Sequence, residues 1–410
     1  MQSLRIGKGI RASYWALPIG LLFLAGGVIQ YASLLSFTQT NLLVLLLLSP
    51  LLLLRRTWRE LSSETPLILL GIHVAVVGLI RGTDPSAIAT YIYYATCTVI
   101  AAVSARIICS RSVERTDLIS VQHNLTRLTK AFLAIQLVVC TLQSIFVYQV
   151  VAFAPIPIIL EDAVSGTMFL KSDASLSAIA EILIVATFLL PTRGRDRLLI
   201  TIMGLAVIWL GGSKAAQAVV FIVILAISAR HVYVRLGMSR SGIKYLLWLA
   251  AGVVLLTLSN TIHEAFVSFV DMTTRAYENR FSWVTADRLA PIGQLFSEDL
   301  KILGDGPLTY YNPIIKSWLY DAGFSTFYSL YIDLGIVGLG LYAAYYVRLI
   351  WKATESILIL FVFGSIVISF SAFNLTLSDL AFAFAINYIL RLYQISRLSK
   401  ADLADSEHTK

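Results

Sequence analysis

Long apolar segments recur from one end of the chain to the other, separated by short stretches of polar and charged residues. Most are roughly 17–25 residues long, which lets an α-helix cross a hydrocarbon core of about 30 Å. Backbone polar groups inside a bilayer must be satisfied within the protein, so these segments are expected to be helices. We place the predicted spans at residues 14–34, 37–54, 66–82, 87–105, 131–153, 175–191, 198–212, 215–229, 245–262, 326–347, 354–373 and 377–393.

This pattern predicts an all-α membrane protein of about twelve transmembrane helices, divided into three parts. Residues 1–262 hold the first nine predicted spans and a small external loop near 154–174. Residues 263–325 form a large external loop with short helices, and residues 326–410 hold the last spans and a tail. The apolar runs on either side of Gly211-Gly212 are interpreted as a helical hairpin, because one continuous helix would leave Lys214 in mid-membrane.

Composition and charge support a membrane location. Of the 410 residues, 58% are hydrophobic and only 14% are charged, whereas soluble domains are about a quarter charged. With the N-terminus inside, most of the 32 lysine and arginine residues fall in cytoplasmic loops and tails, as the positive-inside rule expects. The net charge of +8 is therefore interpreted as a signal for topology rather than for nucleic-acid binding. We predict a multi-pass protein of the bacterial inner membrane with both termini cytoplasmic.

A small group of basic residues remains on the outer side, against the orienting rule. They are Arg81, Lys171, Lys214, Arg275, Arg280, Arg288, Lys301 and Lys316. The large loop holds several of them in a segment that is expected to be helical. Arginine binds phosphate oxygens in a bidentate fork, so Arg280 and Arg288 are candidate ligands for a lipid-linked anion. The alternative is pairing along a solvated helix, or anchoring to anionic head groups.

Ionisable residues near the outer ends of the spans are further candidates. Lys214 follows two glycines at the mouth of the predicted hairpin, where the alternative is a lysine that snorkels to the surface. Glu181 lies about two turns inside its span and needs a partner, for which Lys214 is available. Asp333 and Asp379 are either bases, helix caps or structural partners.

Several kinds of site are disfavoured by the spacing of their usual ligands. The five histidines are spread along the chain, and the three cysteines show neither metal spacing nor a disulfide framework. Phosphate-loop and acidic metal-binding motifs are not found. We therefore expect no cofactor and no metal, which argues against a nucleotide-sugar enzyme with a cytoplasmic metal site.

The region from Asn279 to Tyr346 carries an arginine with a nearby aromatic residue, a Gly-x-Gly motif, an aromatic pair and a glycine-rich start of a span. These are Arg280 and Trp283, Gly304-Asp305-Gly306, Tyr310-Tyr311, and Gly335, Gly338 and Gly340. In this order they resemble the signature region of the O-antigen polymerase and ligase superfamily. The resemblance implies a GT-C-like membrane fold and undecaprenyl-diphosphate-linked sugars as substrates on the periplasmic side.

Within this superfamily the residues favour a Wzy-type polymerase. Ligases usually carry a histidine shortly before the glycine-rich span, and this sequence has none between Gly323 and Ser329. The small loop, however, offers only Lys171 where polymerases often have arginines. An O-antigen ligase that transfers glycan to lipid A-core is therefore kept as one alternative. A transporter of polysaccharide or lipid-linked sugar is another, and would predict inverted repeats and broken helices.

The resemblance implies a metal-independent glycosyltransferase with roles for named residues. Arg280, Arg288, Lys214 and Arg275 are expected to bind the diphosphate and stabilise the leaving group. The carboxylate that activates the acceptor hydroxyl is predicted to be Glu278 or Asp287, followed by Glu181 and Asp333. Sugar stacking is expected from Trp283, Tyr310 and Tyr311. Expected partners are lipid-linked glycans, membrane lipid, a chain-length regulator and a flippase, and no nucleic acid.

Overall fold

The computed structural model describes residues 12–154, 163–168, 173–236, 300–312, 317–318, 325–373 and 376–408. Helices make up nearly all of this part of the chain, and a short antiparallel pair of strands completes it. The first elements are α1 (Ala12–Gly20), a π-helical turn (Leu21–Ala25), α2 (Gly26–Tyr31), α3 (Phe37–Leu48), η2 (Ser49–Leu53), α4 (Arg55–Leu61), η3 (Ser62–Glu64), α5 (Thr65–Ile80) and α6 (Pro85–Arg115).

The remaining elements follow along the chain from Leu118 onward. They are α7 (Leu118–Ile145), α8 (Val147–Ala152), α9 (Asp173–Leu189), α10 (Gly194–Gly211), α11 (Lys214–Leu236), β1 (Tyr311–Asn312), β2 (Ser317–Trp318), α15 (Thr326–Thr354), α16 (Ile357–Phe373), η6 (Thr376–Ser378) and α17 (Leu380–His408).

The helices carry the character of a membrane protein. Within the described residues, four are long and apolar enough to cross a bilayer: Ser62–Ile80, Pro85–Arg115, Leu118–Ile145 and Thr326–Thr354. Large apolar side chains also lie on the outside of the bundle, such as Leu79 (77% exposed) and Leu46 (68% exposed). Apolar surface on this scale is costly in water and expected against lipid chains. The prediction of a helical membrane protein is confirmed at this level.

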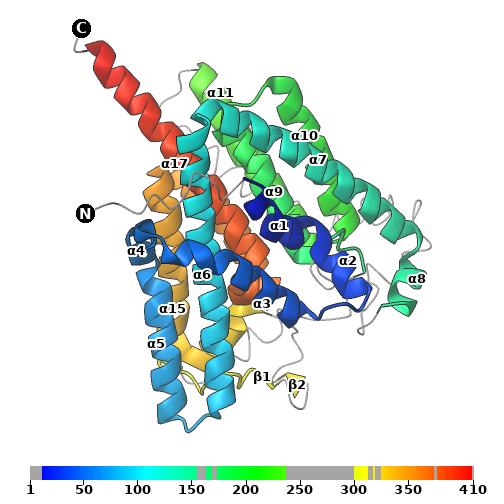
Figure 1. The fold of residues 1–410 in the computed structure, drawn as a ribbon, viewed down its shortest axis with the longest axis vertical. Helices are drawn as coiled ribbons and strands as arrows, with labels where there is room; N and C mark the ends of the chain where they lie inside the picture. Colours follow the sequence, from blue (N-terminus) through cyan, green and yellow to red (C-terminus); the bar gives the residue numbers. More distant parts are fainter. Residues whose placement is uncertain are drawn as a thin grey trace.

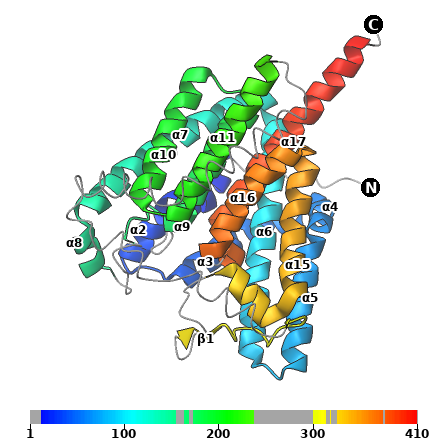
Figure 2. The ribbon, with the colours of Figure 1, turned by 180° about the vertical axis from the view of Figure 1, so that it is seen from behind.

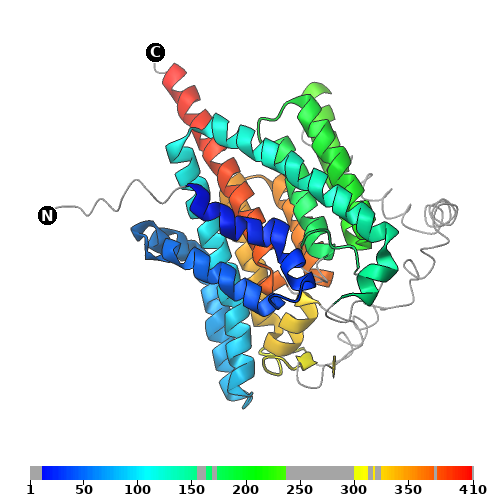
Figure 3. The ribbon, with the colours of Figure 1, turned by 45° about the vertical axis from the view of Figure 1, so that its right-hand side comes forward.

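The bundle has two groups of helices in contact with one another. In Figure 1, α5, α6 and α15 stand side by side, and α17 runs up beside them to the C-terminus; α6 contacts α17, and α15 contacts α5 and α16. Figure 2 shows the second group from behind, with α7, α9, α10 and α11 lying across from α16 and α17. In Figure 3, α1 and α3 cross in front of α6 and α17 at a steep angle.

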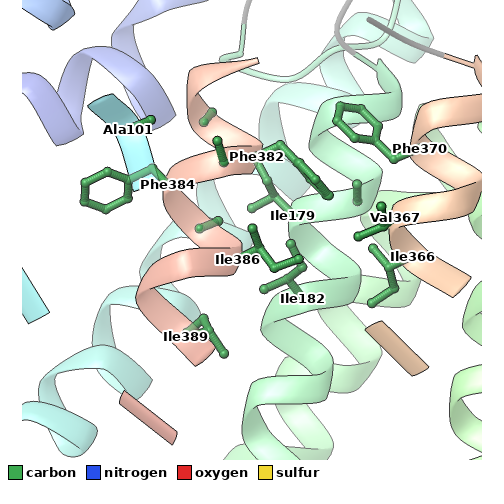
Figure 4. Packing of buried hydrophobic residues seen from close by; sticks show 14 of the residues in the cluster. Ala101, Ile179, Ile182, Ile366, Val367, Phe370, Phe382, Phe384, Ile386 and Ile389 are labelled. Carbon is green, nitrogen blue, oxygen red and sulfur yellow. The ribbon is translucent and has the colours of Figure 1, made fainter. Parts of the chain in front are cut away.

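The core joins the two groups through α9, α16 and α17. Ile179 and Ile182 of α9 point toward Phe382 and Ile386 of α17, with Phe370 of α16 closing the other side (Figure 4). The rings of Phe370 and Phe382 have centroids 4.3 Å apart. In a bilayer such contacts hold helices together by dispersion and close packing rather than by removal from water.

Several helices extend beyond the apolar segments that predict them. We predicted spans ending at 105 and starting at 131, whereas α6 continues to Arg115 and α7 begins at Leu118. Backbone hydrogen bonds continue into polar sequence, because hydropathy marks the edge of the bilayer and not the end of a helix. At its other end α6 starts from Asp84, whose carboxylate caps the Ser86 N–H at 2.7 Å; this bond lowers the pKa of Asp84 below its ordinary value.

The two helices predicted on either side of Gly211-Gly212 are present, and their crossing of the membrane stays a prediction. Helix α10 ends at Gly211, and Gly212 has the left-handed backbone (φ 75°) that terminates many helices. Helix α11 begins two residues later, at Lys214. The turn therefore lies at the two glycines, as the sequence indicates.

Candidate functional site at the break in helix α15

Most of the predicted site residues lie outside the described residues. Arg275, Glu278, Arg280, Trp283, Asp287 and Arg288 all fall in the stretch 237–299, so their predicted roles remain predictions. For Lys214 and Tyr311 the description covers only the backbone. The structure does place Glu181, Asp333, Tyr310 and the Gly304-Asp305-Gly306 motif, together with the glycine-rich start of α15.

Helix α15 is broken at Gly335. This residue has φ 70° and ψ −168°, a conformation outside the helical region. A break within a transmembrane helix frees backbone N–H and C=O groups, which need new partners because lipid supplies none. Residues 301–306 supply them by running along the break.

The hydrogen bonds across this junction are backbone to backbone. The N–H groups of Asp305 and Gly306 donate to the carbonyls of Ile332 (2.8 Å) and Asp333 (3.0 Å). In the other direction, the Ile336 N–H donates to the Lys301 carbonyl at 2.9 Å. The Gly-Asp-Gly motif and the glycine-rich start of α15 are therefore two halves of one structure.

Two side chains, one from α5 and one from the residue that follows it, complete the junction. His73 of α5 donates from Nε2 to the Leu334 carbonyl at 2.8 Å. Arg81, at the end of α5, donates from Nε to the Gly304 carbonyl at 2.9 Å. Arg81 is one of the basic residues predicted on the outer side, against the orienting rule, and this bond explains its presence there. Lys301 is another: its Nζ lies 2.5 Å from Asp305.

Glycine is required where the two halves approach. A Cβ atom on Gly304 would lie 2.5 Å from the Asp333 carbonyl carbon and oxygen, far inside van der Waals contact. A Cβ on Gly335 would collide with the Ile302 carbonyl. Both residues also have positive φ (80° and 70°), which only glycine adopts without strain.

Asp333 is the buried carboxylate at the centre of the junction. Its side chain accepts hydrogen bonds from the Tyr310 N–H at 2.7 Å and the Tyr91 hydroxyl at 3.0 Å. These bonds tie the loop that follows the Gly-Asp-Gly motif, helix α6 and helix α15 to one point. Of the roles open to Asp333 in the sequence, a structural partner is the one that its contacts support.

A pocket opens beside Asp333. It lies between α6, α15 and η6, and its space, counted together with the open solvent at its mouth, is about 430 Å³. Its lining combines aromatic rings, hydroxyl groups and aliphatic side chains, from Tyr91, Tyr94, Leu308, Thr326, Ser329, Leu330, Asp333 and Leu377. Aromatic faces with scattered hydroxyls suit the alternating apolar and polar surfaces of a sugar ring.

Tyr310 and Glu181 do not line this pocket. The ring of Tyr310 is fully buried (0% exposed) and lies against Tyr328, with centroids 6.0 Å apart. In this structure its ring has no face open to a glycan, and its backbone is what serves the junction. Glu181 is 1% exposed, and its Oε1 has no hydrogen-bond partner among the described residues. Pairing of Glu181 with Lys214 remains a prediction.

Asp379 is a helix cap. It accepts from the Phe382 N–H at 2.8 Å, at the start of α17, and from the hydroxyl of Ser175 on α9. Of the alternatives that the sequence leaves open for Asp379, the helix cap is therefore the one observed. The bond to Ser175 also fixes the ends of α9 and α17 to each other.

Sequence reasoning missed the pocket-lining tyrosines of α6. Tyr91 and Tyr94 stand in the run Tyr-Ile-Tyr-Tyr inside a predicted span. A cluster of hydroxyls within an apolar segment is a signal in itself, because each buried hydroxyl needs a partner. The partner of Tyr91 is 242 residues away in the chain, so its identity could not be read from the sequence.

No family model matches this sequence, and no curated protein matches it significantly.

Proposed function

We propose that the chain is a glycosyltransferase of the bacterial inner membrane that polymerises undecaprenyl-diphosphate-linked oligosaccharide repeat units at the periplasmic face. The proposal includes about twelve spans and a GT-C-like fold. One observation carries it: the Gly-Asp-Gly segment closes a break in α15 directly beside a pocket lined with tyrosines and hydroxyls. The same two glycine-bearing segments support the resemblance in the sequence, and they meet in space at a site suited to sugars.

In the proposed reaction an acceptor hydroxyl attacks the anomeric carbon of the donor glycan. A glycosidic bond forms, the bond from that carbon to the diphosphate oxygen breaks, and undecaprenyl diphosphate leaves with both electrons. The hydroxyl proton passes to a carboxylate, for which Glu278 and Asp287 are the candidates. Arg280, Arg288, Lys214 and Arg275 neutralise the diphosphate, so that no divalent metal is needed.

The pocket beside Asp333 is proposed to bind a sugar of the acceptor or donor. Tyr91 and Tyr94 supply aromatic contacts, and Thr326 and Ser329 supply hydroxyls. Asp333 acts as a positioning residue, because both of its oxygens are engaged by Tyr310 and Tyr91. A carboxylate already used in this way is poorly placed to accept a substrate proton.

The test uses purified protein and a lipid-linked repeat unit. Wild-type protein should convert the repeat into a ladder of longer chains, and Arg280→Ala and Tyr94→Ala should reduce the ladder without lowering the amount of folded protein. In a deletion strain, a single repeat on the lipid core is expected. Complete loss of glycan from the core would instead identify a ligase. Full polymerisation by Arg280→Ala at normal protein levels would overturn the proposal.

The break in α15 also favours a second candidate, a transporter of lipid-linked sugar. Transporters bind substrates at discontinuous helices near the midplane. The break at Gly335 lies nine residues after Thr326 and nineteen before Thr354, within the helix and nearer to its Thr326 end than to its Thr354 end. Movement of a lipid-linked sugar across proteoliposomes without any lengthening of the glycan would favour the transporter.

A further inference from the structure

A second pocket lies at the opposite end of α15 and has no place in the proposed reaction. It is bordered by η3, the last turns of α15 and the middle of α17, and its space, counted together with the open solvent at its mouth, is about 440 Å³. From Ile336, just after the break, to Arg348 the helix rises by about 18 Å. Charge distribution predicts that this end is cytoplasmic.

The inner wall of this pocket is neutralised by its own ion pairs. Arg106 of α6 donates to Glu60 from Nε (3.0 Å) and to Glu64 from Nη2 (2.5 Å). Arg391 lies 3.5 Å from the second oxygen of Glu60. Both carboxylates of the pocket therefore have a cationic partner, and neither is left to balance further positive charge.

The outer wall carries two more cations. Arg348 and Lys352 are one helical turn apart on α15, line the pocket and are exposed. Among the described side chains, neither forms an ion pair: the nearby Glu355 is bonded to Arg397 at 2.9 Å. Lys352 instead donates from Nζ to the hydroxyl of Ser63 at 3.0 Å. The pocket as a whole thus has an excess of two positive charges, both on one side.

We propose that this pocket binds the phosphate group of an anionic phospholipid from the adjacent leaflet. The guanidinium of Arg348 offers a bidentate fork for phosphate oxygens, Lys352 adds a point charge and Ser63 adds a hydroxyl donor. Basic pockets between helices on the cytoplasmic side are suited to anionic lipid head groups.

Apolar neighbours favour a lipid over a free phosphate. Trp351 (45% exposed) and Val347 (51% exposed) flank the two cations on α15. Tryptophan at the end of a membrane helix prefers the level of the head groups, where it can contact the upper part of an acyl chain. A soluble phosphate would use the same cations but would gain nothing from these side chains.

The test measures lipid binding to the purified full-length protein in detergent. Phosphatidylglycerol should raise the temperature of unfolding and bind with saturation, whereas phosphatidylcholine should not. The double variant Arg348→Gln and Lys352→Gln should weaken phosphatidylglycerol binding by about tenfold or more. The matched control Arg195→Gln removes an exposed cation from the start of α10 and should bind as the wild type does.

The remaining outcomes separate the possible ligands. If inorganic phosphate competes fully with the lipid and stabilises the protein equally, the site is one for soluble phosphate and the lipid proposal fails. Equal binding by the double variant and the wild type, or an equal loss in the Arg195→Gln control, would also overturn it. If the double variant cannot be purified, the single variant Arg348→Gln, at an exposed side chain, gives the same comparison.

Discussion

At the scale of single residues, the candidate site depends on contacts that other side chains at the same positions would disrupt. Gly335 and Gly304 face each other across the break in α15 with no room for a Cβ. Asp333 satisfies a backbone N–H and a tyrosine hydroxyl at the same point. Both features concern the shape of the site rather than its chemistry, and they can be tested separately from activity.

Replacement of Gly335 by alanine should destabilise the protein. The added Cβ meets the Ile302 carbonyl and the residue keeps a positive φ, so we expect a cost of about 2 kcal/mol or more. Gly340, on the same helix, has nothing within 4 Å of an added Cβ. Gly340→Ala should leave the unfolding temperature in detergent unchanged or slightly raised. Equal behaviour of the two variants would contradict the docking of residues 301–306 into the break.

Substitutions of Asp333 distinguish a positioning role of its side chain from a catalytic one. Asparagine keeps an acceptor for the Tyr310 N–H, so Asp333→Asn should retain most of the polymerising activity. Alanine leaves the Tyr310 N–H and the Tyr91 hydroxyl without a partner, at a cost of about 1–3 kcal/mol for each group. Glycan ladders and unfolding temperatures should be measured together. Loss of all activity in Asp333→Asn, with stability preserved, would make the carboxylate itself part of the chemistry.

Much of this residue-level detail lies beyond sequence reasoning. The Gly-x-Gly motif and the glycine-rich start of α15 are both visible in the sequence, but nothing local shows that they contact each other. Tyr91 pairs with Asp333 across 242 residues, and His73 reaches Leu334 across 261. Such pairs are set by how the helices pack, which a single sequence does not encode in any short pattern.

At the scale of elements, hydropathy is a reliable guide to where helices lie and a poor guide to where they end. Each predicted span within the described residues coincides with a helix or with a run of short helical elements. The apolar stretch that marks a span is a local property, since it reflects burial in lipid or protein. Helices α6, α7 and α17 continue into polar sequence because solvated helical turns satisfy their own backbone.

The ion network of Arg106 joins four elements and gives a prediction at this scale. Arg106 of α6 bonds to Glu60 of α4, to Glu64 of η3 and, from Nη1, to Asn387 of α17 at 2.7 Å. Arg106→Met would leave Glu64, which is 0% exposed, as a buried carboxylate without its cation. We expect a loss of about 3–5 kcal/mol in the free energy of unfolding.

The matched comparison is the double variant Arg106→Met with Glu64→Gln. Removing both charges takes away the uncompensated carboxylate, so the double variant should recover a large part of the lost stability. The free energies of unfolding of the wild type, the two single variants and the double variant, measured in the same detergent, complete the double-mutant cycle. Additive losses in the double variant would show that the two side chains stabilise the protein independently.

At the scale of the whole molecule, the arrangement across the membrane follows from charge rather than from packing. The packed bundle has two ends, with the Gly-Asp-Gly junction at one and the Arg106 network at the other. Nothing in the packing says which end faces the cytoplasm. Lysine and arginine counts in the loops predict that the junction faces outward, because basic loops resist translocation.

Cysteine labelling tests this orientation. The native Cys97, Cys109 and Cys140 are all buried, so the parent protein should react little with a membrane-impermeant maleimide. Ser86, at the start of α6, and Ser399, near the end of α17, are both exposed. In intact spheroplasts Ser86→Cys should be labelled and Ser399→Cys should be protected until the membrane is permeabilised.

The two positions also report on the number of crossings between them. An odd number of predicted spans separates Ser86 from Ser399 when residues 245–262 cross the membrane, and an even number when they do not. Labelling of only one position in intact spheroplasts therefore requires an odd number of crossings, as the full set of predicted spans gives, because an even number would place both cysteines on the same side. Reaction at Ser399→Cys alone would reverse the orientation and place the Gly-Asp-Gly junction in the cytoplasm, where the proposed periplasmic polymerisation could not use it.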